Sequence, residues 1–317
     1  MSGGDFLTIV NTTVPTTPQL CAQNLSALAA RYPFLQVRRL TTTAFGRPVF
    51  TAALGFGPRK VLYSAAHHAN EWITATMLLK FLEDLCRAFQ TGGSLAGVRA
   101  AAILEAAAIH TVPMVDPDGV ALVTGEAGPD SPEYEKARQL AAFYPAIPFP
   151  QGWKANLLGV DLNLQYPAGW LRAREIKFSQ GYTRPGPRDY VGRSPLSQRE
   201  ALAMAAYTEQ LDPHLVIAWH TQGREIYWQY QDYTVAGARE LGEEFARVSG
   251  YTLADTPYES SFAGYKDWFI QEFRRPGFTV EAGLGENPLP LSQFDTIYRD
   301  NLGIFTTAAM GLSTEER

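Results

Sequence analysis

Four short apolar runs stand out along the chain. They occupy residues 59–67, 107–115, 215–220 and 277–283. Each run has the length of a strand, and the second is stopped by the turn signal Asp-Pro-Asp-Gly at 116–119. Continuous apolar runs are typical of strands that are covered on both faces in a parallel sheet. The pattern therefore predicts four buried strands.

Helical patterns lie between and after these runs. Residues 72–85 are hydrophobic on more than one face, which indicates a well-buried helix. Ser197 and Glu200 have the spacing of a capping box at the start of another helical pattern. Residues 291–312 are predicted as a final helix, and residues 121–152, rich in Pro, Gly, Tyr and Glu, as a long surface insertion.

Strands that alternate with helices favour an α/β fold. No repeat, low-complexity tract or linker divides the 317 residues, a length that suits one large domain. We expect a single catalytic domain over residues 1–317, with a central mixed, mostly parallel sheet flanked by helices on both faces. For residues 1–18, the remnant of a linker from an upstream module is an open alternative.

Composition narrows the classes of partner. The net charge is −5, and Lys and Arg are scattered rather than clustered, which argues against a nucleic-acid partner. No apolar run reaches the length of a membrane span, and the N-terminal segment lacks the features of a signal peptide. Cys21 and Cys86 are too few for a disulfide framework, which fits a reducing compartment. We expect a cytoplasmic protein, or a secreted or wall-associated one if an upstream segment has been removed. Nothing in the sequence predicts its oligomeric state.

Polar side chains with metal-binding chemistry gather at the ends of the predicted strands. His67 and His68 end the first, His220 ends the third and Glu281 lies at the end of the fourth. Ligands of such sheets bind at the carboxyl ends of the strands. The other two of the five histidines lie within a strand or before one. The strand ends are therefore the candidate site.

His68 and Glu71 stand three residues apart at a helix entrance, so both can point toward one centre. With a distant second imidazole they make the two-His-one-Glu set of catalytic zinc sites, which leaves one position for water. An isolated His-x-x-Glu is usually a capping glutamate beside a hydrogen-bonded histidine. His220 and Glu281 at other strand ends favour the metal site.

Five segments in order resemble the zinc metallocarboxypeptidase superfamily of the carboxypeptidase A type: HHANEWITATMLLKFLEDL, VPMVDPDGV, GVDLNLQYPAGW, IAWHTQG and GFTVEAG. The resemblance spans nearly the whole chain. DLNLQYPAGW, HTQGREIYW and RRPGFTVEAGLGENPLP are most similar to the bacterial branch that cleaves γ-D-glutamyl–diaminopimelate bonds. The resemblance implies one Zn²⁺ per chain and a peptide or muropeptide substrate, cut between D-Glu and diaminopimelate or lysine.

The resemblance also implies roles for individual residues. His68, Glu71 and His220 are the expected zinc ligands, and Glu281 is the general base that moves the proton of the attacking water. Asp161 matches the carboxylate that orients the first zinc histidine. The alternatives are a buried strand carboxylate with another partner for Glu281 and a surface turn for Asp161.

Two positions depart from the superfamily pattern. Asn163-Leu164 stands where carboxypeptidases have Asn-Arg, and that arginine grips the substrate's C-terminal carboxylate. Leu164 cannot do so, which favours the bacterial branch, while Asn163 stays available to bind substrate. Lys154 replaces the arginine that stabilises the oxyanion. Its alternative is a solvated lysine.

Further predictions concern the substrate pocket. Tyr258 is placed like the mobile tyrosine that closes over the substrate, with Tyr265 as a rival, and either is alternatively a packed loop aromatic. Lys266 and Arg224 are candidates for binding substrate carboxylates, with a solvated position as the alternative.

Three other functions are open: a true carboxypeptidase that uses a cation such as Arg224, a deacylase of the same superfamily, and a metal-free pseudoenzyme that binds wall peptides.

Overall fold

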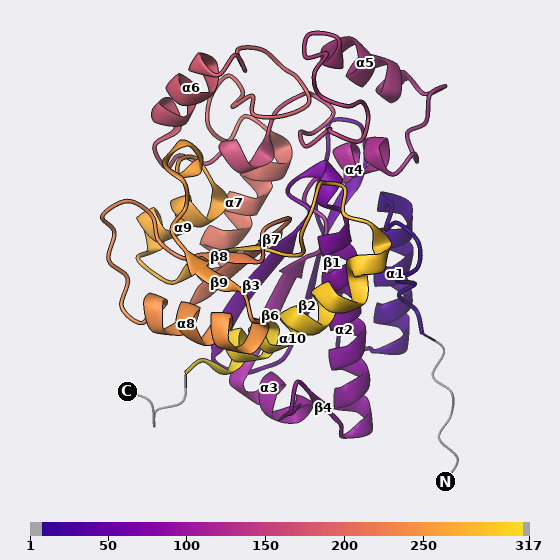
Figure 1. Ribbon diagram of the computed structural model, residues 1–317. Coiled ribbons are helices and arrows are strands. Elements are labelled where there is room, and N and C mark those ends of the chain that lie inside the picture. The colour runs from indigo at the N-terminus through magenta and orange to yellow at the C-terminus, as the bar shows by residue number, and fades with distance from the viewer. Residues whose placement is uncertain (1–7, 313–317) are drawn as a thin grey trace.

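The chain folds around one eight-stranded sheet, as the computed structural model shows for residues 8–312, the part that it describes (Figure 1). The strand order is β1-β2-β6-β3-β7-β10-β8-β9. The bounds of these strands are β1 Gln36–Thr42, β2 Pro48–Leu54, β3 Arg59–Ala65, β6 Ala107–Val112, β7 Leu215–His220, β8 Glu225–Tyr227, β9 Thr252–Ala254 and β10 Gly277–Glu281. A separate pair, β4 (Ser94–Leu95) and β5 (Val98–Arg99), forms a small hairpin.

The four predicted strands form the centre of the sheet. β6, β3, β7 and β10 run parallel to one another, while β1 with β2, β2 with β6 and β8 with β10 pair antiparallel toward the edges. Parallel strands bring their carboxyl ends to one edge of the sheet. There, Ala65 of β3 pairs with Trp219 of β7, and His220 pairs with Glu281 of β10. The expectation of a mixed, mostly parallel sheet in one α/β domain is confirmed.

Helices cover both faces. Their bounds are α1 Pro18–Arg31, α2 Ile73–Thr91, α3 Ala100–Ala106, α4 Pro117–Val123, α5 Pro132–Ala141, α6 Trp170–Ser179, α7 Arg199–Leu211, α8 Ala238–Ser249, α9 Tyr265–Phe273 and α10 Phe294–Met310. Side chains alternate along β3: Val61 and Tyr63 join the core beneath α2 and α10, whereas Leu62 joins the core beneath α7 and α9. This period-two alternation, with apolar residues on both faces, explains why the central strands are largely apolar along their length.

Several local predictions differ from the structure. The predicted insertion 121–152 contains the end of α4 and all of α5, and Figure 1 places α5 together with α6 beyond one end of the sheet. No capping box forms at α7: the helix begins at Arg199, its N-cap Gln198 makes no side-chain cap bond, and Ser197 donates instead to Gln165. Glu200 is buried in the first turn.

A linker remnant is the alternative given above for residues 1–18. Residues 1–7 lie outside the described part, but Val10 is 1% exposed in the main core and the Ile9 amide donates to Glu83 at 2.6 Å. The described end of this segment is therefore packed on the domain. Cys21 and Cys86 are both buried free thiols. Among residues 8–312, no helix is long and apolar enough to cross a membrane.

Candidate metal centre and substrate cleft

The loop after β3 turns two ligand candidates toward one point. β3 ends at Ala65, Ala66 takes a left-handed conformation (φ 47°) and His68 is extended before the 3-10 turn Ala69–Glu71. Thr74 at the start of α2 secures this turn, because its hydroxyl accepts from the Ala66 amide at 3.0 Å and donates to the Glu71 carbonyl at 2.7 Å. The local fold thus fixes the backbone that carries both side chains.

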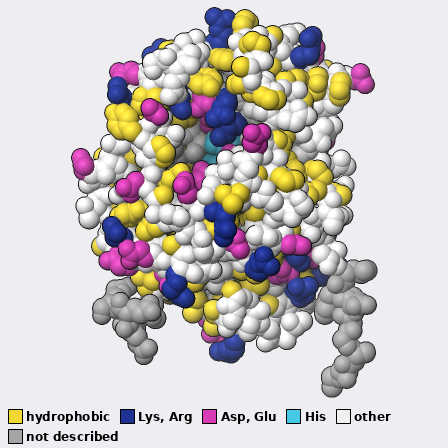
Figure 2. All heavy atoms as spheres, in the orientation of Figure 1, with side chains coloured by type: hydrophobic (Ala, Val, Ile, Leu, Met, Phe, Trp, Pro, Cys, Tyr) yellow, Lys and Arg dark blue, Asp and Glu magenta, His cyan; other side chains and the backbone are white. Residues whose placement is uncertain are grey.

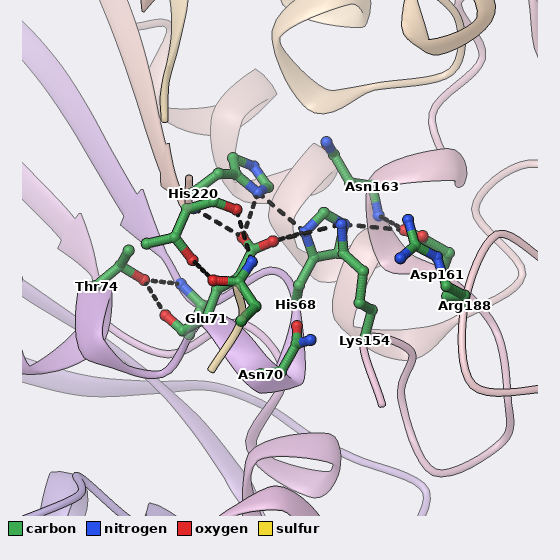
Figure 3. A network of polar contacts seen from close by, with 12 residues as sticks. His68, Asn70, Glu71, Thr74, Lys154, Asp161, Asn163, Arg188 and His220 are labelled. Carbon is green, nitrogen blue, oxygen red and sulfur yellow. Dashed lines mark hydrogen bonds and ion pairs between the residues drawn. The ribbon is translucent and has the colours of Figure 1, made fainter. Parts of the chain in front are cut away.

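His68, Glu71 and His220 converge in the structure (Figure 3). His68 Nδ1 lies 3.0 Å from Glu71 Oε1, and His220 Nδ1 lies 2.9 Å from Glu71 Oε2. All three side chains are buried, and their donor atoms lie within 4.8 Å of one another. Residues 68 and 220 come from the ends of neighbouring parallel strands, as predicted.

The donor geometry fits a zinc ion. Four ligands about 2.1 Å from a tetrahedral zinc ion are about 3.4 Å apart, close to the separations in this cluster. The His68 and His220 Nδ1 atoms are 3.1 Å apart, a separation at which one cation can accept the lone pairs of both rings. His220 Nε2, on the other side of its ring, has no hydrogen-bond partner among the described residues. The triad therefore suits a divalent cation.

Asp161 orients the first histidine. Its Oδ1 lies 3.2 Å from His68 Nε2, so that nitrogen donates and the Nδ1 lone pair faces the triad. Burial opposes a charged carboxyl, but the His68 imidazole and the Lys154 ammonium hold the pKa of Asp161 well below its ordinary value. The same carboxylate accepts the amides of Asn163 and Asp189. Asp161 is thus a buried residue with hydrogen bonds to both carboxylate oxygens, rather than a surface turn residue.

Glu281 stands at the end of β10 beside His220. Its partly buried carboxyl faces the cleft, and burial together with the nearby Glu71 carboxylate raises its pKa to about 8. A divalent cation at the triad favours the ionised form and lowers this pKa. A carboxyl that titrates near neutral pH suits a group that both takes and returns a proton.

Lys154 is drawn into the site by acidic neighbours. Its Nζ lies 3.4 Å from Glu71 Oε1, with 19% of the side chain exposed. Burial lowers the pKa of Lys154, but Glu71 and Asp161 more than offset this and raise it above the ordinary value. Lys154 is therefore a charged cleft residue, and the solvated-lysine alternative is wrong.

The cleft has two compartments on either side of these groups. The inner compartment (180 Å³) includes Asn163, Leu164 and Lys266 in its wall, and the outer one (710 Å³) includes Asn70 and Gln222. Lys154, Arg188, Tyr227 and Glu281 line both. Figure 2 shows the opening as a hollow with histidine at its base and charged side chains around it.

The remaining predicted pocket residues separate into two groups. Asn163 and Leu164 line the inner compartment, where Leu164 is 7% exposed and the Asn163 side-chain oxygen accepts from the Tyr265 amide. Tyr258 is exposed and receives a hydrogen bond from Arg172, outside the residues that line either compartment. Tyr265 is fully buried and bonded to Thr208, so it is not a mobile lid.

The two candidate carboxylate-binding cations, Lys266 and Arg224, also lie in different places. Lys266 lies in the wall of the inner compartment, buried and paired with Asp267 at 2.5 Å, so the solvated alternative is wrong for this residue. Arg224 pairs with Asp300 at 3.4 Å and lines neither compartment. An exopeptidase pocket built on Arg224 therefore has no support in this geometry.

Sequence reasoning missed part of the cleft. Lys177, Arg188, Asp189 and Tyr227 line the inner compartment. The first three come from α6 and the irregular segment that follows it. No periodic pattern there indicates which way a side chain points. The one usable signal was their chemistry: Arg188-Asp189 is a charged pair in a stretch otherwise rich in Pro and Gly.

Comparison with known proteins places this geometry in a family. The profile of the zinc carboxypeptidase family matches residues 21–303. The chain belongs to that family. Zinc is the metal of this family, and His68, Glu71 and His220 are the described residues whose geometry can hold it.

Relatives of this zinc carboxypeptidase family member agree with the assignment. It is 44% identical over 282 residues to gamma-D-glutamyl-L-diamino acid endopeptidase 1 of Lysinibacillus sphaericus, covering 89% of this chain and 69% of that protein. It is 35% identical to the uncharacterized protein YqgT of Bacillus subtilis, over 87% and 72% of the two chains. The bovine thrombin-activatable fibrinolysis inhibitor shares the fold, with a TM-score of 0.72 at 16% identity over 94% and 97%.

Proposed function

We propose that this protein is a zinc-dependent endopeptidase that hydrolyses the amide between a γ-D-glutamyl residue and diaminopimelate or lysine in peptidoglycan peptides. The observation that carries the proposal is the 44% identity, over 89% of the chain, to a gamma-D-glutamyl-L-diamino acid endopeptidase. The catalytic unit is a single domain, and its substrate partner is a peptide or muropeptide. A cytoplasmic location fits its two free buried thiols.

His68, Glu71 and His220 hold the zinc ion in this proposal. When bound, zinc lowers the pKa of water and polarises the scissile carbonyl. Asp161 keeps the His68 tautomer that presents Nδ1 to the triad, because it accepts the Nε2 proton. The chemistry that remains is proton transfer and charge stabilisation, and it falls to residues of the cleft.

Glu281 is the general base and then the general acid. Its carboxylate takes the proton of the attacking water and delivers it to the departing amine of the diamino acid. Its place at the boundary of the two compartments supports both roles, since the acyl and amine halves of the substrate meet there. Burial raises the pKa of Glu281, and a divalent cation at the triad lowers it again, which favours the carboxylate that accepts the proton.

Lys154 stabilises the negative charge that develops on the carbonyl oxygen. It lines both compartments beside Glu281, and its pKa is raised, so it stays cationic during turnover. Asn163 and Leu164 bind the residue on the amine side. Tyr258 is placed to close over the substrate only if its loop moves, because its ring is exposed in this structure.

One tetrapeptide tests the proposed reaction. In L-Ala-γ-D-Glu-diaminopimelate-D-Ala, cleavage at the γ-glutamyl bond yields two dipeptides, whereas a carboxypeptidase releases free D-Ala. Mass spectrometry of the products of the zinc-loaded enzyme should show L-Ala-D-Glu and diaminopimelate-D-Ala. Release of D-Ala alone contradicts the proposal and favours the carboxypeptidase, and cleavage of acyl-amino acids in its place favours the deacylase.

A further inference from the structure

Arg188 presents an unused guanidinium fork to the cleft. It lines both compartments, with 41% of its side chain exposed, and Figure 3 shows it beside Asp161 and Lys154. Its Nε donates to Asp189 Oδ2 at 2.5 Å. Within residues 8–312, both Nη groups lack an ion-pair or hydrogen-bond partner. Those two groups can bind a carboxylate end-on, with one N–H to each oxygen.

Asp189, the partner of the Arg188 guanidinium, is itself fixed in position. Asp189 is buried, takes a left-handed backbone conformation (φ 63°), and its side chain is gripped by Lys177 at 2.8 Å. Its amide donates to Asp161 at 3.3 Å. A left-handed aspartate held by two neighbouring side chains is the kind of strained position found at functional sites, where the surrounding structure fixes the direction of a side chain. Arg188 is thereby aimed by the same carboxylate that orients His68.

The three lysines that line the inner compartment each pair with a carboxylate. Lys154 pairs with Glu71 at 3.4 Å, Lys177 with Asp189 at 2.8 Å and Lys266 with Asp267 at 2.5 Å. Each of these ammonium groups already faces a carboxylate, whereas the two Nη groups of Arg188, which can bind an anion with two parallel bonds, have no partner among residues 8–312. The neighbouring wall at Leu164 is apolar, so it offers a carboxylate nothing.

We infer that Arg188 is the specificity residue that binds a free carboxylate of the substrate next to the scissile amide. The inference rests on the proposed function. A γ-glutamyl bond leaves the α-carboxylate of D-Glu free, and the diamino acid brings a second carboxylate when it is C-terminal. The α-carboxylate of D-Glu is the expected partner, because it is present at every γ-D-glutamyl bond whatever follows.

Matched substrates test the inference and separate the two carboxylates. The parent is L-Ala-γ-D-Glu-L-Lys; one analogue carries an α-amide on the glutamyl residue and the other a C-terminal amide on lysine. For the wild type, kcat/KM should fall about 10- to 100-fold on the first analogue, the loss of a charge-assisted contact. Arg188→Ala should lose a similar factor on the parent and no more on that analogue. Arg188→Lys should lie between, since it keeps charge without the fork.

A binding readout excludes a structural effect. In the slow Glu281→Gln background, calorimetry with the parent peptide should show a Kd about 10- to 100-fold weaker for Arg188→Ala, at unchanged zinc content. Arg193→Ala is the control, because Arg193 is exposed and lies outside both compartments. If both amide analogues bind as tightly as the parent, or if Arg188→Ala weakens all three equally, the inference is wrong while the proposed function stands. A zinc-loaded wild type that cuts none of the three peptides overturns both.

Discussion

His68 and His220 are 152 positions apart in the chain, yet their Nδ1 atoms lie 3.1 Å from each other. Neighbouring parallel strands, β3 and β7, end at the same edge of the sheet and bring them there. Glu71 bridges the two rings with one oxygen to each, at 3.0 and 2.9 Å. This arrangement concentrates metal-binding groups at one point, and the zinc site follows from it.

Removal of His220 should abolish zinc binding. His220→Ala leaves one imidazole and one carboxylate, and two ligands cannot fix the ion. Elemental analysis after dialysis should show far less than one zinc per chain, with loss of activity. His110→Ala is a matched control, because His110 lies on β6 and contacts Tyr207 instead. Stoichiometric zinc in His220→Ala would remove His220 from the site.

Glu281→Gln should keep the fold and zinc but lose turnover. Glutamine preserves the shape of the side chain, yet it cannot accept a proton from water. The loss in kcat should be at least the ~10²–10⁴-fold assigned to general acid–base catalysis. Steady-state kinetics at equal zinc content measures it. A glutamine variant within tenfold of the wild-type rate would point to another base.

The sequence predicted the parts of the fold that carry strong apolar signals. β3, β6, β7 and β10 are buried on both faces, so their residues form continuous hydrophobic runs. β1 was missed because Gln36–Thr42 is a partly exposed, largely polar edge strand. β8 and β9 were missed because each has only three residues, too few to show a period-two pattern. Their pairing is set by neighbours that are distant in sequence.

The candidate site divides in the same way. The zinc triad was predictable because its residues sit at strand ends, where the fold class alone brings them together. Arg188 and Asp189 were not, since their direction depends on a left-handed residue within an irregular segment. Tyr265 shows the converse: a tyrosine near the motif is buried against Thr208 and not mobile.

Glu200 should make stability depend on pH. Burial, with the Asp118 charge, raises its pKa from 4.5 to about 7. The folded state therefore binds the proton more tightly than the unfolded state, and stability falls as pH rises from 4.5 toward 7. Glu200→Gln removes a penalty of up to about 3 kcal/mol that is fully present only above the folded pKa.

Thermal unfolding at pH 5 and pH 8 measures this effect. The melting temperature of Glu200→Gln should rise relative to the wild type at pH 8, and the difference should shrink at pH 5. Glu209→Gln is the control, since Glu209 lies on the exposed side of the same helix. An equal difference at both pH values would show that Glu200 does not titrate in this range.

The most direct measurement compares two substrates at equal zinc loading: L-Ala-γ-D-Glu-diaminopimelate and a blocked hippuryl-type carboxypeptidase substrate. With Leu164 in the wall of the inner compartment, a free C-terminus loses a bidentate contact worth ~1.5–3 kcal/mol per hydrogen bond. We expect kcat/KM for the γ-D-glutamyl peptide to exceed that for the hippuryl compound by at least about one to two powers of ten. A hippuryl substrate cut faster than the γ-D-glutamyl peptide would contradict the assignment and make the protein a carboxypeptidase.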